Sequence, residues 1–205
     1  MRVELGCPVE VMSIVREGDA WRMIAFNHAH GRVAAIEGIL QGLSEPEGRR
    51  AACPVRFEPN RAGAGAAFEC SFRCGMPLKP EGLQLLITRV RLEGNALDWK
   101  SAGGPFAEVD PLALLPPQER EALSRAAGVR AVCRARAYAG AWRCLCAELC
   151  AESQARCPEC HTRREDALAA RPEPAGAGET AAGEAPPRFG FLRRMPSLAM
   201  LRLNR

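Results

Sequence analysis

The sequence has few aromatic residues and no long apolar run. Only 5% of its 205 residues are aromatic, whereas 47% are hydrophobic, which indicates a globular protein with an aliphatic core. No stretch approaches the roughly 18 consecutive apolar residues of a membrane-spanning helix. No N-terminal segment combines a basic start with an apolar run of signal-peptide length. We therefore expect a cytoplasmic protein.

The sequence also lacks the motifs of the common enzyme classes. It has three histidines, no glycine-rich phosphate loop after a strand, no nucleophile elbow, and no pair of acids whose placement the sequence fixes. These absences predict a non-enzymatic protein with no small-molecule substrate. An undetected thiol redox enzyme or hydrolase is the less favoured alternative, and it would need a reactive thiol of low pKa.

Residues 1–110 are predicted to form a β-sandwich domain. Apolar and polar residues alternate in strand-length segments, as at Phe68, Cys70 and Phe72, and turns rich in Gly, Pro, Asn and Asp separate these segments. About six or seven such segments indicate an antiparallel sandwich rather than alternating strands and helices. The strongest, LQLLITRVRLEGNALDW, starts with an apolar run, so we expect it to lie centrally in its sheet.

Residues 111–139 are predicted to be a helical connector. Pro116 and Pro117 suit the first turn of a helix, and the residues that follow them are good helix formers. Gly128 is a candidate for the C-cap, because glycine readily adopts the left-handed conformation that ends many helices. The sequence therefore predicts one short helix that ends before Gly128.

The end of the chain is predicted to contain no stable fold. Residues 167–187 are rich in Ala, Gly, Pro and Glu with almost no large apolar residue, which predicts a disordered linker. Residues 188–205 carry five arginines and no acid among apolar side chains. This basic apolar tail suits docking to an anionic membrane surface or into a partner's groove, and the alternative is an unstructured terminus with no specific role.

Half of the chain's ten cysteines fall within residues 142–166. Cytosolic thiols are kept reduced, so this number favours metal binding or buried thiols over disulfides. Two turns that each present two thiolates can hold one Zn²⁺ ion tetrahedrally. Residues 140–166 are therefore predicted to form a zinc ribbon, because a unit this small has too little core to fold without a structural metal. The candidate ligands are Cys144, Cys146, Cys157 and Cys160.

Other interpretations exist for some thiols and histidines. A redox role for the CPEC sequence would need a βαβ setting, which nothing around it supplies. Cys150 lies between the two thiol pairs and His161 follows the second, so either is a possible replacement ligand, but we leave both out of the predicted site. His28 and His30 have a spacing found in metal sites, although two histidines in a polar turn are more often ordinary loop residues.

The cysteine pattern resembles a family. A tryptophan, Trp142, two residues before Cys-x-Cys, then a spacer and Cys-x-x-Cys, is similar to the zinc ribbon of uncharacterised bacterial proteins whose N-terminal part is a β-sandwich. FNHAHGRVAAIEGIL and LLITRVRLEGNALDW resemble strands of that sandwich. Ala147, Cys150 and His161 stand where the family has Gly, Asn and Gly. The resemblance implies the same four cysteine ligands, no known enzymatic activity, and a binding or scaffolding role.

The predicted fold is mainly β: an immunoglobulin-like antiparallel β-sandwich, a short helix, a small zinc ribbon and a disordered C-terminal tail. We expect a non-enzymatic zinc-binding module for protein interaction or scaffolding, with an unidentified protein partner and with Trp142 packed over the metal site. The alternative is a nucleic-acid-binding zinc-ribbon protein, in which the basic region from Arg125 to Arg143 contacts phosphates.

Overall fold

The computed structural model describes residues 1–43, 49–60, 62–75 and 78–172. This part of the chain is mainly β, as the sequence predicted. None of its helices is long and apolar enough to cross a membrane. Met1–Glu173 form one compact unit, and the predicted boundaries after residues 110 and 139 remain predictions.

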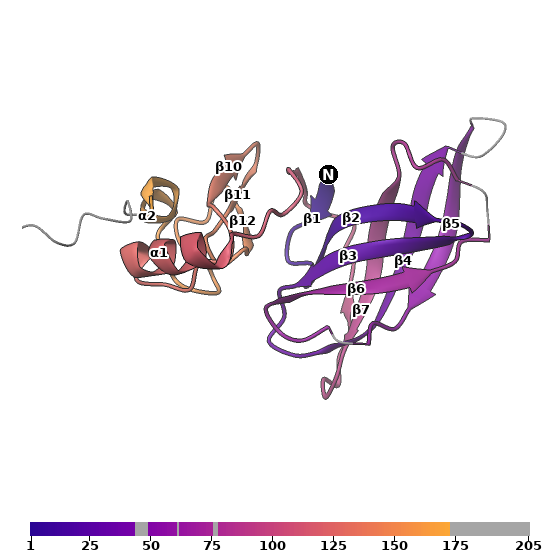
Figure 1. Ribbon diagram of the computed structural model, residues 1–205, viewed down its shortest axis with the longest axis horizontal. Coiled ribbons are helices and arrows are strands. Elements are labelled where there is room, and N and C mark those ends of the chain that lie inside the picture. Colours follow the sequence, from indigo (N-terminus) through magenta and orange to yellow (C-terminus); the bar gives the residue numbers. More distant parts are fainter. Residues whose placement is uncertain (44–48, 61, 76–77, 173–205) are drawn as a thin grey trace, which may run out of the picture. The chain divides into compact units, whose positions relative to one another are not determined.

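Two antiparallel sheets are formed by β2 to β8, and we call them the paired sheets (Figure 1). Their strand orders are β2-β3-β6 and β5-β4-β7-β8. The seven strands agree with the six or seven predicted segments. Their bounds are β2 (Val9–Glu17), β3 (Ala20–Asn27), β4 (Val33–Leu43), β5 (Arg50–Phe57), β6 (Ala66–Phe72), β7 (Gln84–Leu92) and β8 (Trp99–Lys100).

The paired sheets share one hydrophobic core. On β6, Phe68 and Phe72 are buried whereas the intervening Glu69 is exposed, which is the alternation that the sequence predicted. The ring of Phe72 stacks on that of Phe57 from β5, with 5.3 Å between centroids, so the two sheets meet directly. Cys70 is half-buried against the same core and behaves as a small apolar residue there.

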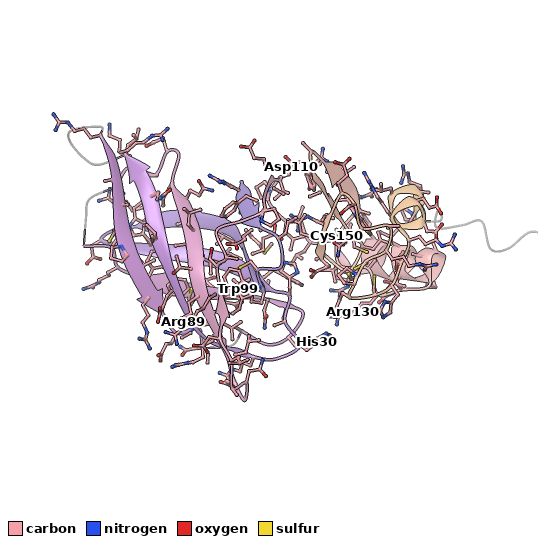
Figure 2. All side chains as sticks on the ribbon, turned by 180° about the vertical axis from the view of Figure 1, so that it is seen from behind. His30, Arg89, Trp99, Asp110, Arg130 and Cys150 are labelled. Atoms are coloured by element: carbon pink, nitrogen blue, oxygen red, sulfur yellow. The ribbon has the colours of Figure 1, made fainter. Side chains whose placement is uncertain are left out.

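β7 lies between β4 and β8, as predicted for this segment. Its pairing with β8 is short, because it includes only Arg89 with Lys100 and Val90 with Trp99. Figure 2 labels Arg89 and Trp99 on these neighbouring strands. Beyond β8 the chain forms β9 (Phe106–Glu108), which pairs with β1 (Arg2–Glu4) in a separate two-stranded sheet.

Residues 111–172, which we call the cysteine module, hold a three-stranded antiparallel sheet and two helices (Figure 1). The predicted helix is confirmed, since α1 begins at Pro117 and its C-cap is Gly128 with φ 67°. The elements are α1 (Pro117–Ala127), β10 (Arg136–Tyr138), β11 (Ala141–Arg143), β12 (Leu149–Ala151) and α2 (Arg164–Ala169).

The cysteine module packs on the paired sheets through shared buried residues. Phe26 of β3 belongs to one small cluster with Val132, Cys133 and Ala147 of the module. A second cluster joins Ala107 of β9 to residues of β11 and β12. The module therefore rests on apolar contacts with the preceding part of the chain as well as on its own interior.

The predicted linker at residues 167–187 needs a correction at its start. Helix α2 continues to Ala169, and Ala167 is only 1% exposed in the buried cluster that contains the cysteines. Burial of this small side chain offsets the ordering entropy of the helix, which the local composition could not indicate. The remainder of the predicted linker from residue 173, and the predicted tail at residues 188–205, lie outside the described residues.

Candidate metal centre

Four cysteine thiols meet at one point of the cysteine module. The sulfur atoms of Cys144, Cys146, Cys157 and Cys160 all lie within 4.8 Å of one another. The Sγ atoms of Cys144 and Cys160 are 3.4 Å apart, and those of Cys146 and Cys157 are 3.6 Å apart. The four thiols that the sequence spacing singled out are therefore close enough to hold one metal ion.

Two similar backbone turns present these thiols. In the first, the amide of Ala147 donates to the carbonyl of Cys144 at 3.0 Å, and the amide of Cys144 donates to Glu148 at 2.9 Å. In the second, the amide of His161 donates to the carbonyl of Cys157 at 3.0 Å, and the amide of Cys157 donates to Thr162 at 2.9 Å. Each turn closes directly after its second cysteine, which brings the two sulfurs of the turn to the same side.

The closing residue of each turn has a left-handed backbone. Ala147 has φ 80° and His161 has φ 60°, and these are the only residues other than glycine with positive φ in the described part of the chain. They occupy the two positions at which the resembled family has glycine. The same turn conformation is thus built here without glycine, at a conformational cost of about 1 kcal/mol per residue.

Replacing His161 by glycine is expected to stabilise the protein by about 0.5–1 kcal/mol, because the side chain of His161 is exposed and its backbone strain would be relieved. Ala147→Gly is the matched comparison. The methyl group of Ala147 is fully buried, so its removal loses packing that offsets the relief. Chemical unfolding of the metal-loaded variants measures both effects, and equal gains for the two glycines would contradict this account.

The thiols strongly influence one another's ionisation. Hydrogen bonds from Cys144, Cys146 and Cys150 lower the pKa of the Cys157 thiol. The hydrogen bonds with Cys144 and Cys157 raise the pKa of Cys146 in turn. One thiolate is therefore stabilised by its neighbours, whereas four adjacent thiolates repel one another. Only a cation at the centre lets all four ionise together.

A fifth thiol and a tryptophan lie next to the four sulfurs. Cys150 is buried on β12, where it faces Trp142 of β11 across the sheet, and the neighbouring Cys157 together with burial raises the pKa of its thiol. Neither Cys150 nor His161 belongs to the group of four that are mutually close. Trp142 is fully buried in one cluster with Cys144 and Cys157, and its indole N–H donates to the carbonyl of Gln154 at 2.9 Å. Figure 2 labels Cys150 within the cysteine module.

A buried ion pair connects the metal centre to the paired sheets. Arg143, directly before Cys144, donates two hydrogen bonds to the carboxylate of Glu10 on β2, at 2.5 and 2.7 Å. The side chains are 3% and 1% exposed. Sequence analysis missed this pair because the two residues are 133 positions apart. The one feature of the sequence that pointed to a buried Glu10 is its position between Val9 and Val11 in an apolar stretch.

His28 completes the polar cluster around Glu10. Its Nε2 atom lies 3.2 Å from a carboxylate oxygen of Glu10, and its side chain is 8% exposed. Burial alone would raise the pKa of Glu10, but the hydrogen bonds from His28 and Arg143 outweigh burial and lower it. Burial would similarly lower the pKa of Arg143, and its hydrogen bonds with Glu10 raise it. Both partners are therefore held in their charged forms.

The predicted pair of histidines does not form a metal site. His28 contacts Glu10, whereas His30 lies 3.1 Å from the carboxylate of Glu159 and is exposed. Among the described residues, the one set of three or more potential ligand atoms close enough for a metal is the four-cysteine group. His28 and His30 are loop residues, as the preferred interpretation of the sequence had them, and each contacts an acid from another segment of the chain.

The predicted basic region from Arg125 to Arg143 is divided by the structure. Arg134 pairs with Glu119 at 2.8 Å, Arg136 pairs with Asp110, and Arg143 is buried. The prediction that this whole region contacts phosphates is therefore wrong for Arg143, whose guanidinium faces Glu10 instead of solvent. Arg125 and Arg130 remain exposed; Figure 2 labels Arg130 and Asp110.

Comparison of the chain with protein families, with curated proteins and with solved structures found no match.

Proposed function

We propose that this protein is a non-enzymatic, zinc-binding module for protein association. It would combine an immunoglobulin-like sandwich, formed by the paired sheets, with a zinc ribbon formed by the cysteine module. The observation that carries the proposal is the mutual approach of four cysteine sulfurs within 4.8 Å. The resemblance of the cysteine spacing to bacterial zinc-ribbon proteins supports the same assignment.

The donor set fits Zn²⁺. Four sulfurs at about 2.3 Å from a central zinc are separated by about 3.8 Å in a regular tetrahedron. The separations of 3.4 and 3.6 Å need a small expansion to reach this value, and the widest separation, which is within 4.8 Å, needs a contraction of at most about 1 Å. The residues that would bind the ion are Cys144, Cys146, Cys157 and Cys160.

The geometry favours a structural ion over a catalytic one. Catalytic zinc keeps a coordination position for water or substrate, whereas four cysteine ligands fill the tetrahedron. Two of the four, Cys144 and Cys157, are fully buried, and Trp142 belongs to the same buried cluster. The ion would therefore hold the two turns and α2 together and leave the outer surface of the module for partners.

A nucleic-acid partner is the second candidate, and one observation favours it. Arg120, Arg125 and Arg130 line one shallow hollow on α1 and the segment after it, together with Glu121 and Ser124. Among the described residues, these three arginines are in no ion pair, unlike Arg134 and Arg136. Protein association is preferred because the neighbouring Arg134 and Arg136 are paired with acids and Arg143 is buried.

Zinc content and partner capture test the proposal on the same full-length, reduced protein. We expect one zinc per chain and captured proteins that withstand nuclease treatment, with both lost in Cys157→Ser/Cys160→Ser. The matched control is Cys70→Ser/Cys74→Ser, which changes two half-buried thiols outside the group of four. Metal-free wild-type protein would contradict the zinc assignment. Capture of nucleic acid that weakens steeply with salt and with Arg125→Ala/Arg130→Ala would favour the second candidate.

A further inference from the structure

One edge of β7 is paired over only part of its length. On one side β7 pairs with β4 from Gln84 to Leu92. On the other side β8 covers only Arg89 and Val90, and the last rung of this ladder is the amide of Ser101 donating to the carbonyl of Thr88 at 2.9 Å. Within the described residues, no strand pairs with residues 84–87 on this side.

The chain that begins to cover this edge is drawn away by Glu4. The carboxylate of Glu4 accepts hydrogen bonds from the hydroxyl of Ser101 and from the amides of Ala102 and Gly104, the latter two at 2.8 and 3.3 Å. The next residues then form β9, which pairs with β1 instead of β7. The pairing of β8 with β7 therefore stops near Thr88, although β7 itself continues to pair with β4 as far as Gln84.

A cavity of about 330 Å³ lies beside this uncovered edge. It is lined by β7, by β2 of the opposite sheet and by β1. Packed interiors rarely contain voids much larger than a water molecule, so a space of this size beside a strand edge is unusual. Half-buried apolar side chains form much of its wall, among them Ile14, Ile39, Leu83, Ile87 and Phe106.

We propose that this cleft binds an extended segment of a protein partner, which continues the β7–β8 ladder along residues 84–87. The inference rests on the proposed role in protein association and adds a docking surface on the paired sheets, separate from the outer surface of the cysteine module. The segment adds a strand to the sheet through its main chain. Its apolar side chains, at every second position, enter the cavity, and the alternate side chains face solvent.

The uncovered strand edge favours a peptide over a small apolar molecule. An unpaired edge presents a row of N–H and C=O groups that only another main chain satisfies in register. The ladder already formed at Thr88 sets the position of the added strand. At the other end, the side-chain amide of Gln84 donates to the carbonyl of Arg2 at 3.4 Å and crosses from β7 to β1. The paired part of the segment is therefore about four residues long, or roughly 13 Å.

A soluble model peptide tests the proposal on the full-length protein. The probe is fluorescein-labelled Lys-Val-Thr-Val-Thr-Val-Lys, read by fluorescence anisotropy on preparations whose zinc content is also measured. Two further versions carry N-methyl groups on the valine or on the threonine nitrogens. Alternate N–H groups of a strand point to opposite sides, so only one of the two sets can face β7. We expect saturable binding of the probe, a loss of at least tenfold in affinity for one methylated version, and little change for the other.

Two protein variants locate the binding. Ile14 lines the cavity, whereas the next residue of β2, Val15, does not and is 40% exposed. Ile14→Lys is expected to weaken binding at least tenfold and Val15→Lys to leave it unchanged. Absence of binding to zinc-loaded protein, or equal binding of all three peptides, would overturn the strand-addition proposal and leave the zinc assignment intact. Peptide binding by protein that contains no zinc would instead contradict the proposed function alone.

Discussion

Removal of the proposed zinc ion by a chelator is expected to unfold the cysteine module and to leave the paired sheets folded. The strands β10, β11 and β12 have three residues each, too short for independent stability. The cluster around them contains five cysteines beside Trp142 and aliphatic side chains, so a third of its fifteen residues are the thiols themselves. Structural zinc contributes an apparent binding energy on the order of 10–16 kcal/mol at neutral pH, which exceeds what the small apolar contacts of the module supply.

Amide hydrogen exchange with and without chelator measures this effect. We expect amides of β11 and β12 to lose protection, and amides of β3 and β4 to keep it, because the latter lie in the paired sheets, which share a core of their own. Zinc added back is expected to restore protection. Cys150→Ser is the matched variant, since Cys150 is buried beside the group of four without belonging to it and should retain the metal. Protection of β11 that survives complete metal removal would contradict a structural role for the ion.

The sequence predicts the local features of this site well. Ligand spacing is a property of a few neighbouring residues, so the approach of Cys144 to Cys146 and of Cys157 to Cys160 follows from short turns. The helix that ends before Gly128 follows from similar local rules. The left-handed backbone at Ala147 was foreseeable only through the resemblance to a family with glycine there, because alanine itself gives no such signal.

Contacts between residues that are far apart in the sequence could not be predicted from it. The Glu10–Arg143 pair depends on how the cysteine module packs on β2, and no local pattern encodes that contact. For the same reason Arg143 counts as basic surface in the sequence and is buried in the structure. The short β8 is a further case. Hydrogen bonds with Glu4, from the start of the chain, draw the residues after β8 away from β7.

Replacing Arg143 by methionine is expected to destabilise the protein by about 3–5 kcal/mol. The substitution keeps a long apolar side chain but leaves the carboxylate of Glu10 buried without its main partner, and an uncompensated buried charge is costly. Thermal and chemical unfolding of metal-loaded protein measure the loss. The matched control is Arg134→Met, because Arg134 forms an ion pair with Glu119 in which both side chains are exposed, and such pairs are worth only about 0–1 kcal/mol.

A second substitution separates the buried charge from the loss of packing. Glu10→Gln combined with Arg143→Met removes both charges, so the double variant should recover much of the stability that Arg143→Met loses. Zinc content is measured in parallel, because Arg143 directly precedes Cys144. Equal instability of the single and double variants would mean that Arg143 acts through packing alone.

The pH dependence of the unfolding free energy tests whether the buried charge of Glu10 causes the instability of Arg143→Met. In the wild type the lowered pKa of Glu10 adds stability that is fully present above the ordinary value of 4.5 and is lost as the pH falls through the lowered pKa. In Arg143→Met, we expect burial to outweigh the remaining hydrogen bond from His28 and to raise the pKa of Glu10. Acidification then protonates a carboxylate that the folded state no longer stabilises. The difference in unfolding free energy between the two proteins should therefore shrink as the pH falls from 7 toward 5. Zinc content is followed over the same pH range, and a gap that widens while both proteins keep their metal would show that the Glu10–Arg143 pair is not the source of the difference.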